Sequence, residues 1–135
     1  MALRRQLHRK FNILVALGGK TALQKFEEED AIAVCVADMR MPNMTGLELL
    51  EQVHEISPDT VCMMLTGNAD QATAVDAINR GRIFRFFPKP YDPVRLEQAL
   101  QDGLRQYHLV RTEKSLIQET LAGSVKVLTD VMAEL

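Results

Sequence analysis

Short apolar runs alternate with amphipathic segments along most of the chain. The runs that are almost entirely apolar cover residues 12–16, 31–37, 61–65 and 83–87. Continuous apolar runs of this length are typical of parallel strands that are buried on both faces of a sheet. Apolar residues at helical spacing lie between and after these runs, and they predict helices at about 20–29, 45–56, 68–80 and from 93 onward.

Cap and turn residues mark the ends of these segments. Thr45 and Glu48 have the spacing of a capping box, which predicts that a helix begins at this point. Another helix is expected to begin near Asn68, and Asp92-Pro93 would begin the last one with proline at the first helical position. The helix after Thr45 would bury a stripe made of Leu47, Leu50, Val53 and Ile56.

The alternation of strands and helices predicts the α/β class. Right-handed crossovers between parallel strands place helices on both faces of such a sheet, and ligands bind at the carboxyl ends of the strands. Asp38, Thr66 and Lys89 each lie at or just beyond the end of a different predicted strand. An acid, a hydroxyl and an amine are therefore expected to meet at one edge of the sheet.

These three groups suit phosphoryl transfer. An aspartate carboxylate can attack phosphorus and form an acyl phosphate. Lys89 would then supply a fixed cation for the phosphoryl oxygens, and the Thr66 hydroxyl would supply a hydrogen-bond donor. A simpler interpretation is also open, in which Asp38 caps a turn, Thr66 caps a helix and Lys89 is a solvated surface residue.

Length and composition narrow the possibilities. A chain of 135 residues with 47% apolar and 25% charged residues is the size of one domain and can bury a core. Its 2 cysteines have no zinc-site spacing and cannot form a disulfide framework, so we expect a cytoplasmic protein. No apolar run is long enough to span a bilayer, so we expect no membrane partner.

The amino-terminal segment has a basic bias, because residues 1–26 contain no acid. Leu3, Leu7 and Phe11 share one side of a predicted helix, and most of the bases lie elsewhere around it. A solvated helix face is the preferred interpretation. The alternatives are a targeting sequence, disfavoured by the lack of serine, and a nucleic-acid surface, disfavoured by the lack of interleaved aromatic residues. We therefore expect no nucleic-acid partner.

Three motifs together resemble a known family. Residues 38–46 follow the pattern D-x-x-M-P-x-M-x-G, residues 65–67 read Leu-Thr-Gly, and residues 86–90 read Phe-Phe-Pro-Lys-Pro. Over roughly residues 1–107 the chain is similar to the receiver domain of two-component response regulators. Residues 108–135 would then be a helical extension or linker. This extension resembles the linker that joins receivers to output domains of the HD phosphohydrolase type.

The resemblance implies a flavodoxin-like, doubly wound parallel sheet and a role for each motif. Asp38 would accept a phosphoryl group from a histidine kinase, and Thr66 and Lys89 would contact that group. Phe86 would be the switch aromatic, with ordinary core packing as the alternative. The peptide bond before Pro90 would be cis, a form that is rare outside X-Pro bonds.

The resemblance also exposes two missing features. Receivers begin with a strand that ends in a pair of Mg²⁺-binding acids, and the sequence has neither. Asp38 and the backbone carbonyl of Arg40 would make only a weak metal site, because Mg²⁺ prefers octahedral oxygen coordination. Mg²⁺ is the cofactor expected for the family, but we expect this chain to bind it poorly and to be phosphorylated slowly.

The missing strand would be central in the flavodoxin-like order 2-1-3-4-5. Its loss leaves the strand at 12–16 without its usual partner, and unpaired buried backbone groups are costly. Three outcomes are open: the strand at 12–16 moves beside the strand at 31–37, another chain fills the gap, or the segment is partly unfolded.

The last helix is expected to continue through Leu135 as a long C-terminal helix. Steps of four and three residues along it define a stripe suited to a partner helix. This stripe contains Val110, Lys114, Ile117, Leu121, Ser124, Leu128, Val131 and Leu135. A dimerising or signalling helix is the preferred interpretation, with a possible homodimer through it, and packing onto its own domain is the alternative.

The combined interpretation is a signalling switch, not an enzyme. In this view the chain is a receiver that uses Asp38 as its phosphoacceptor and changes its contacts with partners or output domains. Two alternatives stay open. One is a degenerate receiver that is never phosphorylated and acts only as a dimerisation and interaction module. The other is a truncated regulatory fragment of an HD-type phosphodiesterase.

Overall fold

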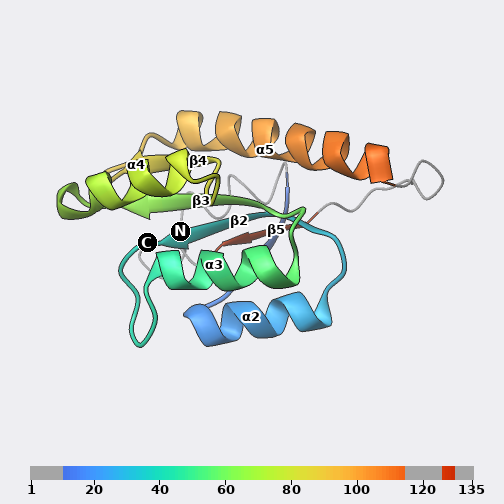
Figure 1. Ribbon diagram of the computed structural model, residues 1–135, viewed down its shortest axis with the longest axis horizontal. Helices are drawn as coiled ribbons and strands as arrows, with labels where there is room; N and C mark the ends of the chain where they lie inside the picture. Colours follow the sequence, from blue (N-terminus) through green and yellow to red (C-terminus); the bar gives the residue numbers. More distant parts are fainter. Residues whose placement is uncertain (1–10, 115–125, 130–135) are drawn as a thin grey trace.

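The computed structural model describes residues 11–114 and 126–129, which form a parallel sheet with helices on both faces (Figure 1). The strands are β1 (Asn12–Val15), β2 (Ile32–Asp38), β3 (Val61–Thr66), β4 (Arg85–Pro88) and β5 (Lys126–Thr129). The helices are α2 (Gly19–Glu28), α3 (Gly46–Ile56), α4 (Gln71–Asn79) and α5 (Pro93–Lys114), with a 3-10 turn, η1, at Asn68–Asp70. The predicted α/β class and parallel sheet are confirmed. The helix predicted around Leu3 and Leu7 lies outside the described residues.

The strand that comes last in the sequence lies inside the sheet. The strand order is β1-β5-β2-β3-β4, and every neighbouring pair is parallel. Leu128 of β5 lies opposite Leu14 on one side and opposite Cys35 on the other. This is the position that the flavodoxin-like order gives to the missing first strand. The gap is therefore filled by the chain's own β5, which is none of the three outcomes predicted.

The prediction of one continuous helix through Leu135 is wrong at residues 126–129. The helical part of the prediction holds over α5 (Pro93–Lys114), whereas residues 126–129 form the strand β5. The reason is pairing, because β1 and β2 would otherwise each leave a row of backbone groups without partners. Leu128 is only 1% exposed within this sheet, so it is not available to a partner helix. The stripe positions from Ile117 to Ser124 and beyond Thr129 lie outside the described residues.

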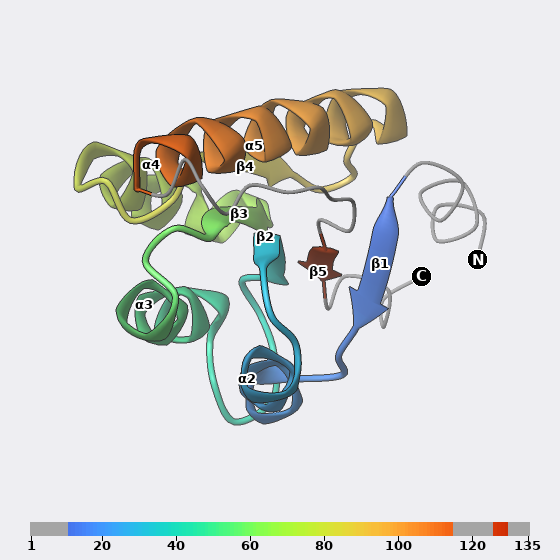
Figure 2. The ribbon, with the colours of Figure 1, turned by 90° about the vertical axis from the view of Figure 1, so that its right-hand side faces the viewer.

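The helices cover the two faces of the sheet unequally. Helix α5 runs across one face, and α2 and α3 lie on the other (Figure 2). Each face has its own core. Buried residues on the α5 side include Val34, Val36, Met63, Leu65, Leu96 and Leu100. Buried residues on the opposite side include Cys35, Ala37, Met64, Leu49, Leu50, Val53 and Ala74, so α4 belongs to the α3 side.

The start of α3 was predicted correctly from its cap residues, but its buried face was predicted only in part. The predicted capping box is present, because the Thr45 side chain accepts a hydrogen bond from the Glu48 amide and Glu48 accepts one from the Thr45 amide. Of the predicted stripe, Leu50 and Val53 are buried but Ile56 is 56% exposed, and Leu49 is buried instead. Helical spacing allows either set of residues to share one face, both residues 49, 50 and 53 and the predicted stripe. Packing against the sheet decides which of the two sets is buried.

The start of α4 also differs from the prediction. The chain makes the η1 turn where a helix was expected to begin near Asn68, and α4 begins at Gln71 with Asp70 as its cap residue. Within the described ranges, no helix has both the length and the apolar character needed to cross a membrane.

Candidate functional site

The carboxyl ends of β2, β3 and β4 lie side by side at one edge of the sheet. Asp38 at the end of β2 is in register with Leu65, and Thr66 at the end of β3 is in register with Pro88. The Lys89 amide donates to the Thr66 carbonyl at 2.8 Å, which extends the pairing of β3 and β4 past the strand ends. Backbone pairing between the strands therefore fixes the positions of the Cα atoms of Asp38, Thr66 and Lys89.

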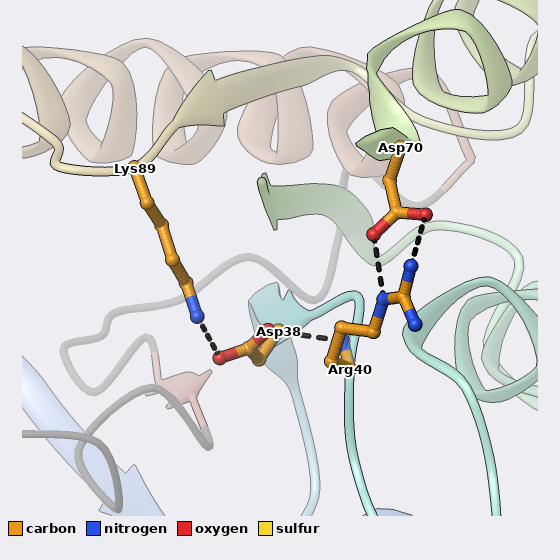
Figure 3. A network of polar contacts seen from close by, with 4 residues as sticks. All are labelled: Asp38, Arg40, Asp70 and Lys89. Atoms are coloured by element: carbon orange, nitrogen blue, oxygen red, sulfur yellow. Dashed lines mark hydrogen bonds and ion pairs between the residues drawn. The ribbon is translucent and has the colours of Figure 1, made fainter. Parts of the chain in front are cut away.

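Asp38 and Lys89 are in direct contact. The Lys89 Nζ lies 2.5 Å from Asp38 Oδ2, and the Asp38 side chain is only 3% exposed (Figure 3). The Arg40 amide donates to the other carboxylate oxygen, Oδ1, at 3.0 Å. A buried carboxylate is stable only when it is paired or hydrogen-bonded, and here one cation and one amide meet that need.

Thr66 differs from its neighbours because its hydroxyl has no partner. The residue is fully buried, and Oγ1 accepts and donates no hydrogen bond among the described residues. Buried polar groups without partners are uncommon in proteins and cost about 1–3 kcal/mol each. The site therefore holds an unused donor at the edge where Asp38 and Lys89 meet.

Arg40 connects the loop after β2 to the segment after β3. Its Nε donates to Asp70 Oδ2 at 2.9 Å and its Nη2 donates to Oδ1 at 3.2 Å. Figure 3 shows the guanidinium pointing toward Asp70, while Lys89 approaches Asp38 from the other side. The hydrogen bond and charge of Asp70 raise the pKa of Arg40. Asp70 was not predicted as a site residue, because the sequence shows only an acid in the short segment that follows Thr66.

The loop between Asp38 and α3 is held close to the sheet. The Gly46 amide donates to the Met39 carbonyl at 2.9 Å. A Cβ at position 46 would collide with the Asp38 backbone carbonyl, so the first residue of α3 has to be glycine for this approach. The glycine of the 38–46 motif thus fixes the distance between α3 and the aspartate.

Comparison with known proteins agrees with this arrangement. Residues 1–101 match the family model for the response regulator receiver domain. The chain belongs to this family. The receiver shares 28% identity over 132 residues with the hydrogenase transcriptional regulatory protein HoxA of Bradyrhizobium diazoefficiens. The match covers 96% of the receiver chain but 27% of HoxA, so the chain spans about a quarter of that relative's length.

Solved structures show the same likeness. A crystal structure described as adenylate cyclase from Rhodopirellula baltica is 38% identical to the receiver, with a TM-score of 0.83 and 88% of each chain covered. The signal receiver domain of an HD domain-containing protein from Pseudomonas fluorescens Pf-5 is 32% identical, with a TM-score of 0.64. That match covers 71% of this chain and 70% of the other.

The remaining motif residues lie on or beside β4. Phe86 pairs with Met64 and packs, partly buried, against the core on the α3 side, whereas Phe87 packs against the α5 side. The receiver therefore presents Phe86 on the same side of the sheet as α4. The peptide bond between Lys89 and Pro90 is cis.

The described residues do not fit a Mg²⁺ ion. One oxygen of Asp38 is held by Lys89 and the other by the Arg40 amide. Across residues 11–114 and 126–129, no group of three or more acidic, histidine or cysteine side chains could hold a metal. Mg²⁺ needs several oxygen ligands in octahedral geometry, and this donor set does not provide them.

Proposed function

We propose that this receiver accepts a phosphoryl group on Asp38 from the phosphohistidine of a histidine kinase. An Asp38 carboxylate oxygen attacks phosphorus, the bond between phosphorus and the imidazole nitrogen breaks, and the kinase histidine leaves with the bonding electron pair. The product is an acyl phosphate on Asp38. The contact between Asp38 and Lys89 is the single observation that carries this proposal.

The roles of the neighbouring groups follow from their charges. Lys89 Nζ already lies against the carboxylate, so it can neutralise the phosphoryl oxygens without a large movement. The Thr66 hydroxyl has no partner in the unmodified state and can donate to the phosphoryl group once it is present. Phe86 lies on the adjacent strand and would follow Thr66 as the switch aromatic.

The receiver acts in this proposal as a cytoplasmic switch and not as a turnover enzyme. The curated relative HoxA is named a transcriptional regulator, and the chain spans only part of it. The likeness to the receiver of an HD domain-containing protein supports a regulatory role beside an output domain. The homodimer through the C-terminal helix stays a prediction, although Leu128 is buried in the sheet and cannot contribute to it. Slow phosphorylation also stays a prediction.

Replacement of Asp38 by asparagine tests the proposal. The full chain is incubated with acetyl phosphate and Mg²⁺, and intact mass spectrometry counts the phosphoryl groups added. We expect the wild-type chain to gain one group slowly and Asp38→Asn to gain none. Asp30→Asn is the matched control, since Asp30 is exposed and lies just before the start of β2, the strand that ends at Asp38. Equal modification of Asp38→Asn and wild type would refute the role of Asp38, and no modification of either would favour the interaction-only alternative.

A further inference from the structure

Asp70 occupies the cap position of α4 without capping it. It is the residue before the first helical position, but its side chain accepts no hydrogen bond from the α4 amides. Aspartate is one of the preferred cap residues because its carboxylate normally accepts from the second or third helical amide. Both Asp70 oxygens are instead held by the Arg40 guanidinium. The carboxylate therefore has two possible sets of partners and uses the one outside its own helix.

The backbone of Asp70 agrees with this. Its φ is −107° and its ψ is 4°, whereas capping residues normally have extended backbone. Asp70 also ends the η1 turn, whose backbone bond runs from the Asp70 amide to the Gly67 carbonyl at 3.1 Å. Capping by Asp70 would require its ψ to change to an extended value. Arg40 thus stabilises the arrangement observed, in which the Asp70 side chain does not cap α4.

Arg40 is anchored beside the phosphoacceptor. Its amide already donates to Asp38 Oδ1, so its side chain begins within the site although it points out of it (Figure 3). A phosphoryl group on Asp38 would place about two negative charges there. Guanidinium groups bind phosphate through two parallel hydrogen bonds, which makes such a group a strong competitor for the single charge of Asp70.

We propose that Arg40 is a positioning residue that moves from Asp70 to the phosphoryl group, and that the released Asp70 carboxylate then caps α4. The proposal rests on the proposed function for its trigger, phosphorylation of Asp38. The exchange converts a charge change at the sheet edge into a new hydrogen bond at the start of α4. A carboxylate at a helix amino terminus is also favoured by the helix dipole, so the released Asp70 has a stable second position.

The exchange can be tested first without phosphate. Arg40→Gln removes the guanidinium and should free Asp70 to cap α4. Hydrogen exchange measured by NMR should then slow at the Ala72 and Thr73 amides by about fivefold, the size expected for one cap. The matched control is Arg80→Gln, which removes an equally exposed arginine that pairs with Asp76 in the same helix. Unchanged exchange at Ala72 and Thr73 in Arg40→Gln would overturn the proposal.

A second variant separates capping from a general change in stability. In the double variant Arg40→Gln with Asp70→Ala, the carboxylate is gone and the added protection should disappear. Protection that survives in the double variant would show that Asp70 is not its source and would overturn the proposal.

The phosphorylated chain tests the trigger. After modification with acetyl phosphate, the wild type should show the same slowing at Ala72 and Thr73, while Arg40→Gln should show no further change. Modification of Asp38 without this slowing would overturn the exchange but leave the proposed function intact. Absence of modification would overturn the proposed function, and the result with unmodified Arg40→Gln would still decide whether Asp70 can change partners.

Discussion

Two buried threonines show how differently the same side chain can be used. Thr66 Oγ1 has no partner among the described residues, whereas Thr60 Oγ1 donates to the Ile32 carbonyl at 2.7 Å and lies 2.6 Å from Ser57 Oγ. We expect Thr66→Val to leave the free energy of unfolding unchanged or to raise it by up to about 1 kcal/mol, because an unsatisfied hydroxyl is removed. Thr60→Val should lower it by about 1–3 kcal/mol, because the Ile32 carbonyl loses its donor. Urea unfolding followed by circular dichroism measures both.

The test compares the change in the free energy of unfolding of Thr66→Val with that of Thr60→Val. Both replace a buried threonine by the same residue, so the packing change is matched. A loss of stability in Thr66→Val as large as that in Thr60→Val would show that the Thr66 hydroxyl is already satisfied. It would then not be a reserved donor for a phosphoryl group.

At the residue scale, strand ends were predictable and side-chain partnerships were not. Asp38, Thr66 and Lys89 could be placed on one edge because parallel strands end on the same side of a sheet. The pair between Arg40 and Asp70 could not, since 30 positions separate the two residues and Asp70 has an ordinary local role available as a cap. Only the three-dimensional approach of the two loops decides which partner the carboxylate takes.

At the scale of elements, β5 is the most consequential strand. It fills the gap between β1 and β2, and its residue Leu128 is 1% exposed. We expect Leu128→Ala to lower the free energy of unfolding by about 2–5 kcal/mol, as for other buried leucines. Leu109→Ala on α5 is the matched control, because Leu109 is 60% exposed and its truncation should change stability by less than about 0.5 kcal/mol.

Urea unfolding of the two leucine variants decides whether β5 is part of the folded sheet. If Leu128→Ala lowered the free energy of unfolding as little as Leu109→Ala, β5 would contribute little to the core. The position between β1 and β2 would then not be filled by β5. A loss of the expected size would show that residues 126–129 complete the sheet in solution.

The sequence misassigned β5 for a physical reason. Leu128 belongs to an apolar series with steps of three and four, which predicts a helix face, and four residues are too few to show the alternation of a strand. Pairing on both sides overrides the local preference, because β1 and β2 each need a partner. The longer apolar runs of β2 and β3 were predicted correctly, since every residue in them is buried.

At the scale of the whole molecule, the sheet is held together unevenly. Strand β1 pairs only with β5 among the described strands, and both have four residues, while β2 and β3 are longer and are packed from both faces. Local opening is expected where strands are short and few contacts hold them. We therefore expect β1 and β5 to open together without the rest of the sheet.

Cys35 and Cys62 can report this opening. They lie opposite each other on β2 and β3, both are buried, and only Cys35 also lies opposite β5. Burial raises the pKa of the Cys62 thiol to about 12, so at pH 8 it is almost entirely protonated and unreactive until the sheet opens. In single-cysteine variants made by Cys35→Ala or Cys62→Ala, we expect an aromatic disulfide reagent at pH 8 to label Cys35 several-fold faster than Cys62. Leu128→Ala should widen the difference, and full denaturation should abolish it. Equal rates in the folded state would mean that the sheet opens as one unit and that β1 and β5 are not a separate part of it.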